Sequence, residues 1–173
     1  MSERIRPARP AEATALRELA HRSKAHWPYS EEFLTAVRPL LRLEAADIER
    51  DEVRVIEVDE TVAGWHRVSF RGEHAELEDL WLEPSFIGLG RGRLLFEDAA
   101  AVAQLGGARE LEWDAEPFAI GFYIAMGGVV IGEVPSAAEA GRMLPRMRLE
   151  LGATPGAAPG RSVRTADGDP RRS

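Results

Sequence analysis

Three glycines at alternate positions, Gly88, Gly90 and Gly92, interrupt the stretch WLEPSFIGLGRGRLLFEDA between a strand-like run and an apolar helix. A tight turn needs one or two glycines, so a purely structural turn does not require all three. Backbone N–H groups that no Cβ crowds, at the positive end of a helix dipole, are well placed to bind an anion. The segment therefore predicts a loop that holds a phosphate or pyrophosphate, with a simple turn as the alternative.

Neither of the two common nucleotide-binding glycine motifs fits this loop. A Rossmann fingerprint needs G-x-G-x-x-G, whereas the spacing here is G-x-G-x-G, and the flanking parallel crossover pattern is missing. A P-loop needs a Lys followed by Ser or Thr, where this sequence has Arg93 and Leu94.

The rest of the chain alternates between helical and strand periodicity. Ser30 is a predicted helix N-cap, and Pro39 is expected to bend or end that helix. Asp59-Glu60 is the predicted turn of an antiparallel hairpin. The predicted strands are 3–8, 52–58, 62–70, 75–82, 109–115, 129–134 and 145–151, and the predicted helices are 10–24, 30–39, 93–105 and 117–126. This order predicts a mixed α/β (α+β) fold with a largely antiparallel sheet of about seven strands and about four helices.

Composition limits the domain count and the classes of partner. With 173 residues and 45% hydrophobic content, the chain is expected to form one domain over 1–151, followed by a disordered tail over 152–173 rich in Gly, Pro and Ala. A net charge of -7 argues against nucleic acid as the main partner. There are no cysteines, which excludes disulfides and thiolate metal sites but says nothing directly about the redox compartment. The N-terminus has no apolar signal segment and no apolar run is long enough for a membrane span, so a cytoplasmic protein without membrane contact is expected.

The segment LEDLWLEPSFIGLGRGRLLFEDA, followed by a strand and then GFYIAMGG, resembles the GCN5-related N-acetyltransferase (GNAT) superfamily. The signature of that family runs from a strand through Pro and Q/R-x-x-G-x-G/A into a helix, and the resemblance covers approximately Ile5 to Leu151. SKAHWPYSEEFL, GEVPS and GRMLPRMRLEL are similar to features of bacterial small-molecule acetyltransferases. Ile87 stands at the Q/R position, so a bound pyrophosphate would depend more heavily on backbone amides.

The resemblance implies a splayed sheet and a site for acetyl-CoA as co-substrate. The strand carrying Leu80 and Leu82 would pair with the pantetheine arm, and the loop amides would hold the pyrophosphate, with an arginine adding charge. Relatives often have Asn contacting the coenzyme where this chain has Asp114. The residues expected to bind the coenzyme are Leu80, Leu82, Gly88, Leu89, Gly90, Arg91, Gly92, Arg93 and Asp114.

The activity implied is acetyl-CoA-dependent N-acetylation of a primary amine by direct attack in a ternary complex. Such a reaction benefits from a base for the ammonium and a proton donor for the thiolate. The resemblance implies Tyr123 as the donor, with a buried structural tyrosine as the alternative. Glu78 is the first choice of base, because strict alternation places it on one face with Leu80 and turns Asp79 away; Glu76, Asp79, water, or a merely exposed acidic rim remain alternatives.

The acceptor is expected to be a small-molecule or peptide amine. Trp27, Tyr29 and Phe33 lie in the region that covers the substrate side in the family, so they are predicted to line an acceptor pocket or to belong to the core. The histidines lack metal-ligand spacing, so no metal is expected. A non-catalytic acyl-CoA sensor or partner-binding module on the same fold is the alternative function, and a homodimer is compatible with the family.

Overall fold

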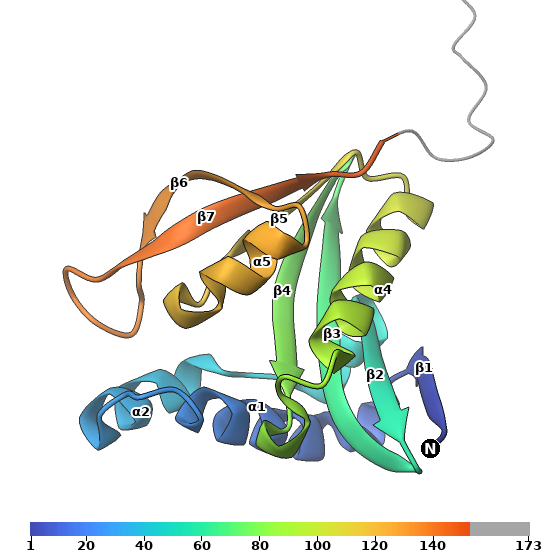
Figure 1. The fold of residues 1–173 in the computed structure, drawn as a ribbon, viewed down its shortest axis with the longest axis horizontal. Helices are drawn as coiled ribbons and strands as arrows, with labels where there is room; N and C mark the ends of the chain where they lie inside the picture. Colours follow the sequence, from blue (N-terminus) through green and yellow to red (C-terminus); the bar gives the residue numbers. More distant parts are fainter. Residues whose placement is uncertain (153–173) are drawn as a thin grey trace, which may run out of the picture.

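The structure is a computed structural model that describes residues 1–152 and has a seven-stranded sheet at its centre (Figure 1). The strand order is β1-β2-β3-β4-β5-β7-β6, and all neighbours pair antiparallel except β4 and β5, which are parallel. The strands are β1 (Glu3–Pro7), β2 (Glu52–Val58), β3 (Thr61–Arg71), β4 (His74–Leu82), β5 (Glu110–Asp114), β6 (Val129–Pro135) and β7 (Met143–Glu150). The predicted mixed fold with a largely antiparallel sheet is confirmed. The predicted tail lies, from residue 153 on, outside the described residues.

Five α-helices accompany the sheet, one more than predicted: α1 (Ala13–Ala25), α2 (Glu31–Val37), α3 (Ala45–Arg50), α4 (Arg91–Leu105) and α5 (Ile120–Ala125). Ser30 caps α2 as predicted, its hydroxyl accepting from the amide of Phe33 at 3.1 Å, and Pro39 lies in the 3₁₀ turn that ends it. The unpredicted α3 has six residues, too few for a clear apolar period. Within residues 1–152, none of the helices is long and apolar enough to cross a membrane.

The helices form two layers on opposite faces of the sheet. α4 and α5 cover one face, where Phe96, Trp113 and Tyr123 belong to one buried cluster. α1 and α3 cover the other face, where Leu16 and Trp65 belong to a second cluster. Both layers bury the apolar stripes of their helices against alternate residues of the strands, which is what amphipathic elements require.

The sheet opens between β4 and β5. These strands pair only at His74 with Glu110, Ala75 with Leu111 and Glu76 with Glu112. Figure 1 shows them adjoining at one end and diverging toward the other. The part of β4 beyond Glu76 therefore has no strand neighbour on its β5 side within the described chain, and its backbone groups on that side are available to a ligand.

A β-bulge in β4 corrects the prediction of which side chains share a face. Arg67 pairs with Asp79 and Val68 with Leu77, so Glu78 has no partner of its own. An extra residue reverses the alternation that follows it.

The consequence of the bulge is visible in the packing of β4. Leu77 and Leu80 both contact the core cluster beneath α4. Glu78 and Asp79 instead face the α3 side, where Glu78 accepts from the Ser69 hydroxyl at 2.7 Å. The expectation that Glu78 shares a face with Leu80 is wrong, because the bulge turns Glu78 to the α3 side. The expectation that Asp79 points away from Leu80 is confirmed.

Candidate functional site

A hollow of about 440 Å³ lies where β4 leaves β5, and it is called the central hollow here. It brings together many of the predicted site residues from separate segments: Trp27, Leu80, Leu82, Gly88, Gly90, Gly92, Arg93 and Tyr123. Its other lining residues are Ser23, Trp81, Ile87, Glu116, Phe118, Ala119, Phe122, Ala125 and Met126. A mainly apolar concave site with a few polar groups is the usual form of a small-molecule site.

The glycine loop forms one end of the central hollow. Gly88 and Gly90 have φ of 79° and 85°, a left-handed conformation that favours glycine, and Gly90 directly precedes α4. Gly92 serves a different need, because a Cβ there would lie 3.3 Å from Leu82 and 3.5 Å from Phe122. Two glycines therefore shape the loop, and the third lets the helix approach its neighbours.

The backbone amides of the glycine loop are free to bind a ligand. The first helical hydrogen bond runs from the Leu94 amide to the Gly90 carbonyl at 3.3 Å. Within residues 1–152, the amides of 89–93 donate to no backbone carbonyl. Because these amides lie at the positive end of a helix of four turns, the arrangement is suited to bind an anion.

The side chains around these amides differ in whether they are already bonded to other protein groups. Arg91 donates to the Leu89 carbonyl at 2.9 Å and forms an ion pair with Glu3 of β1, so its charge is already compensated. Arg93 lines the hollow, is 63% exposed and lies 3.8 Å from Glu97. Leu89 is 58% exposed and Ile87 lines the hollow. Arg93 is therefore the better placed of the two predicted arginines to add charge to a bound anion.

Tyr123 projects from α5 into the middle of the site. Its ring packs against Trp113 and Phe96, at centroid distances of 5.1 and 5.8 Å. Its hydroxyl has no hydrogen-bond partner among the described residues, although the residue is only 8% exposed. Burial raises the pKa of Tyr123, and the charges of Glu116 and Asp79 raise it further. The hydroxyl therefore keeps its proton at neutral pH and has no structural partner that would explain its position.

Asp79 is the carboxyl group whose pKa is most clearly suited to proton transfer. Its side chain is 13% exposed and accepts from the Trp81 indole N–H at 2.9 Å, while Arg67 lies 3.9 Å away. Burial raises the pKa of Asp79 to about 7, against the opposing effects of Trp81 and Arg67. Asp79 does not itself line the central hollow, but the Trp81 side chain that it bonds does. The charge of Asp79 is one of the causes of the raised pKa of Tyr123.

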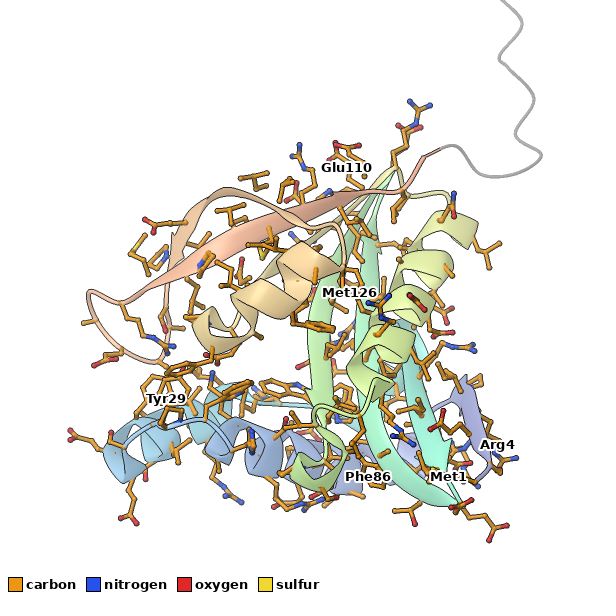
Figure 2. All side chains as sticks on the ribbon, viewed as in Figure 1. Met1, Arg4, Tyr29, Phe86, Glu110 and Met126 are labelled. Atoms are coloured by element: carbon orange, nitrogen blue, oxygen red, sulfur yellow. The ribbon has the colours of Figure 1, made fainter. Side chains whose placement is uncertain are left out.

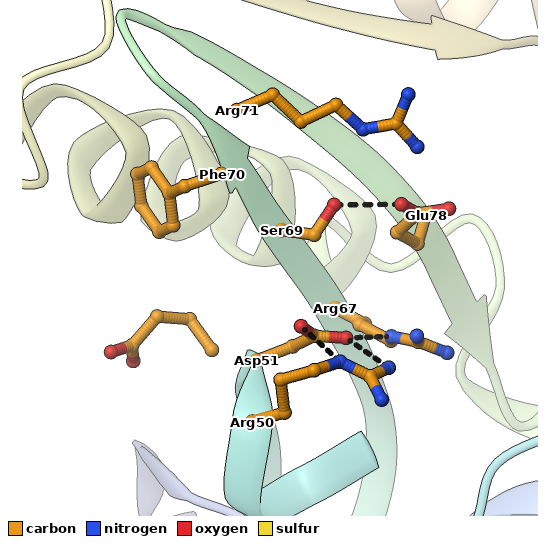
Figure 3. Close-up of a pocket in the computed structure, with 8 residues that line it drawn as sticks. Arg50, Asp51, Arg67, Ser69, Phe70, Arg71 and Glu78 are labelled. Carbon is orange, nitrogen blue, oxygen red and sulfur yellow. Dashed lines mark hydrogen bonds and ion pairs between the residues drawn. The ribbon is translucent and has the colours of Figure 1, made fainter.

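Glu78 lines a different hollow of about 500 Å³, shown in Figure 3. It is exposed there, with Ser69, Arg67 and Arg71 as further lining residues. The structure does not bring Glu78 together with Tyr123 and the glycine loop. The catalytic role predicted for Glu78 stays a prediction, and the geometry gives it no support.

Asp114 and Glu76 are also outside the central hollow. Both pair with Arg146 of β7, which donates to Asp114 at 2.9 Å. His74, Glu76 and Glu112 offer ligand atoms within 4.8 Å of one another, a grouping that sequence spacing missed. Arg146 already pairs with both carboxylates of this group, however, and Arg148 pairs with Glu112 as well. The expectation that no metal is bound stays an expectation.

Of the three aromatic residues predicted to line an acceptor pocket, one lines the central hollow and the other two pack behind its wall. Trp27 stacks on Phe118 at 5.7 Å with an interplanar angle of 11°, and both line the hollow. Tyr29 stacks on Phe33 at 4.2 Å and donates its hydroxyl to Glu116, which is another lining residue. Trp27 therefore faces the hollow, while Tyr29 reaches it through Glu116.

Glu116 is the centre of a group that sequence reasoning missed, called the Glu116 cluster here: Lys24, Tyr29, Glu116 and Arg142. Lys24 forms an ion pair with Glu116, and Arg142 donates to the Tyr29 hydroxyl and lies 4.0 Å from Glu116. Figure 2 shows Tyr29 between the α1–α2 region and the β6–β7 hairpin. Lys24 and Tyr29 lie five positions apart, but Glu116 and Arg142 come from regions far along the chain, so no local pattern joins the four residues.

Comparison with known proteins places this arrangement in a family. The model of the acetyltransferase (GNAT) family matches residues 14–127. A search of curated proteins found no match.

Many solved structures share the fold. A GCN5-related N-acetyltransferase structure from Rhodopseudomonas palustris, also described as an aminotransferase of class II, has a TM-score of 0.74 at 20% identity, covering 87% of this chain and 97% of that one. The PaiA N-acetyltransferase of Thermoplasma acidophilum in complex with coenzyme A has a TM-score of 0.66 at 21% identity, covering 87% and 99%. YncA of Salmonella typhimurium, a putative acetyltransferase solved with acetyl-CoA, has a TM-score of 0.65 at 21% identity, covering 92% and 98%.

These likenesses show a shared fold, and the family match spans the first helix, the glycine loop and the helix of Tyr123. The chain belongs to the GNAT acetyltransferase family.

Proposed function

We propose that the protein transfers the acetyl group of acetyl-CoA to a primary amine by direct attack within a ternary complex. The observation that carries this proposal is the hydroxyl of Tyr123, which lacks a protein partner in the described chain and lies in one hollow with the glycine loop and the unpaired part of β4. A proton donor, an anion-binding loop and a free strand edge are what a coenzyme thioester needs in order to bind and react.

Acetyl-CoA is proposed to lie along the central hollow. The amides of residues 89–93 would hold the pyrophosphate, with Arg93 adding charge, and the backbone near Leu80 and Leu82 would pair with the pantetheine arm. Two structural neighbours solved with coenzyme A and with acetyl-CoA support the choice of coenzyme.

The proposed reaction moves two protons. The amine nitrogen attacks the thioester carbonyl carbon, so that a C–N bond forms and the C–S bond breaks. Asp79 takes the proton that the ammonium loses, directly or through water, because its pKa of about 7 suits a general base near neutral pH. Tyr123 gives its proton to the departing thiolate, and the second proton that the nitrogen loses as the amide forms returns to the Tyr123 oxygen, directly or through water. The two protons that leave the nitrogen thus end on Asp79 and, by way of Tyr123, on the thiolate. Asp79 here takes the place of Glu78, which lies in the other hollow.

The experiment compares the unaltered protein with Tyr123→Phe. Coenzyme A thiol release and the N-acetylated product are measured for acetyl-CoA with a panel of amines, and coenzyme affinity is measured by calorimetry. Removing the hydroxyl while keeping the ring is expected to lower kcat by about 10²- to 10⁴-fold with little change in coenzyme affinity.

Two results would contradict the proposal. A Tyr123→Phe protein with unchanged kcat and lowered stability would assign the hydroxyl a structural role. Coenzyme binding without thiol release for any amine would favour the alternative function, a non-catalytic acyl-CoA sensor or partner-binding module. The apolar Ile87 at the usual polar position of the loop is the feature compatible with that alternative.

A further inference from the structure

The Glu116 cluster contains more positive than negative charge. Lys24 and Arg142 are both largely buried, at 8% exposure for the residue and 17% for the side chain. Within residues 1–152, the single carboxylate within 4.0 Å of either cation is that of Glu116. Buried charges are normally paired, so one positive charge beside Glu116 lacks a counterion. Glu116 lines the central hollow, and the two cations contact it from outside that lining.

The carboxylate of Glu116 has little capacity left for a second cation. One oxygen accepts from Lys24, and the other accepts from the Tyr29 hydroxyl and, at 3.3 Å, from the Phe118 amide. An acceptor with an additional ammonium group near Glu116 would also meet Lys24 and Arg142. Although Glu116 is the acidic residue on the wall of the hollow, its surroundings therefore disfavour a polycationic acceptor.

Arg142 has donor capacity that the protein does not use. Its side chain donates to the Tyr29 hydroxyl, lies 4.0 Å from Glu116, and packs over Phe33 and Tyr29, with its guanidinium carbon 4.6 and 4.9 Å from the two ring centroids. A guanidinium carries five N–H donors in a planar fork that matches a carboxylate. Burial lowers the pKa of Lys24 and the Arg142 charge lowers it further, against the opposing effect of Glu116.

We propose that the acceptor carries a carboxylate that binds at Arg142 and Lys24, next to the stacked pair Trp27 and Phe118, so that the acceptor class is amino acids with an apolar side chain. This inference rests on the proposed acetyl transfer and identifies its substrate class. The carboxylate neutralises the excess charge of the cluster, and the apolar side chain lies against the aromatic pair that lines the hollow. The amine is left to face Asp79 and the thioester.

The experiment compares acceptors that carry a carboxylate with matched acceptors in which it is replaced by an amide. The values of kcat/KM for L-phenylalanine and L-phenylalanine amide are compared, with the same comparison for leucine and with spermidine as a polycationic amine. The amide has the less basic amine, so its intrinsic reactivity at neutral pH does not favour the acid. We expect the acids to be preferred by at least about 10-fold, because the site would leave Arg142 unpaired against the amide.

Arg142→Gln tests the assigned residue. It is expected to raise the KM of the acids by about 10- to 100-fold while changing kcat/KM of the amides less than about 3-fold. Arg109→Gln is the matched control, because Arg109 is 74% exposed and pairs only loosely with Glu73 at 3.7 Å, so it should change neither. Equal losses for acid and amide in Arg142→Gln, or a preference for the amides or spermidine, would overturn the inference.

A binding measurement separates this inference from the proposed function. Calorimetric titration of N-acetyl-L-phenylalanine and of its amide into the protein with coenzyme A requires no turnover. Tighter binding of the acid, lost in Arg142→Gln, supports the carboxylate site even if no amine is acetylated. Equal binding of acid and amide overturns it even if acetyl transfer is found.

Discussion

At the scale of single residues, the account depends on the ionisation of Asp79. Its pKa of about 7 predicts that kcat/KM rises with pH up to about 7 and then levels, because the carboxylate form accepts the proton of the ammonium. Asp79→Asn should remove this rise of kcat/KM with pH and lower kcat by about 10²- to 10⁴-fold. The measurement is the pH profile of thiol release for both proteins.

Stability should respond to pH in the opposite direction. In the unfolded chain Asp79 ionises near its usual pKa of about 4, whereas the folded protein keeps it protonated up to about 7. Stability that this group contributes is therefore fully present below about pH 4 and is lost as pH rises through 7. Each pKa unit is worth about 1.4 kcal/mol, so Asp79→Asn should be more stable than the unaltered protein above pH 7 by up to a few kcal/mol.

Glu78→Gln is the matched control for both measurements. Glu78 is the neighbouring acid, but it is exposed and bonded to Ser69 in the other hollow. The Glu78→Gln substitution should leave both kcat and the rise of kcat/KM with pH unchanged. If the rise of kcat/KM with pH survives in Asp79→Asn and disappears in Glu78→Gln, the base is Glu78, which strand alternation favoured.

At the scale of elements, the glycine loop and the start of α4 carry the binding of the anion. Gly90→Glu places a negative charge beside the free amides, and it is expected to abolish coenzyme A binding in a calorimetric titration. The added Cβ itself meets nothing within 4 Å, so the protein should remain folded apart from the strain of φ 85°.

Two controls separate charge from backbone strain. Gly90→Ala brings the same strain without charge and should reduce affinity much less. Gly72→Glu brings both strain and charge to another left-handed glycine, in the turn between β3 and β4, and should leave affinity unchanged. Binding that survives in Gly90→Glu would show that the loop does not hold the pyrophosphate.

At the scale of the whole molecule, the features that the sequence predicted correctly are those that depend on residues close together in the chain. Ser30 caps a helix, Asp59 and Glu60 turn the hairpin with φ of 46° and 67°, and the alternate glycines separate β4 from α4. These features depend on residues within a few positions of one another, so a single sequence contains the information.

The features that prediction missed depend on distant pairing. The bulge at Glu78 is a change in the register between β3 and β4. The pattern of residues along one strand does not reveal its register with another strand. The Glu116 cluster joins residues up to 113 positions apart, from Tyr29 to Arg142. The choice of Asp79 over Glu78 as the base, and the proposed acceptor site, therefore depend on the folded chain.

The central claim is that acetyl-CoA binds across the gap between β4 and β5, from the glycine loop to Tyr123. Amide hydrogen exchange with and without coenzyme A tests it most directly, because the claim names backbone groups. We predict added protection in residues 77–82 and 88–94 and in α5, with no change in residues 50–54 and 69–72 around the hollow of Glu78. Binding of coenzyme A without protection in β4 and the glycine loop, or with protection centred on the hollow of Glu78, would contradict the account.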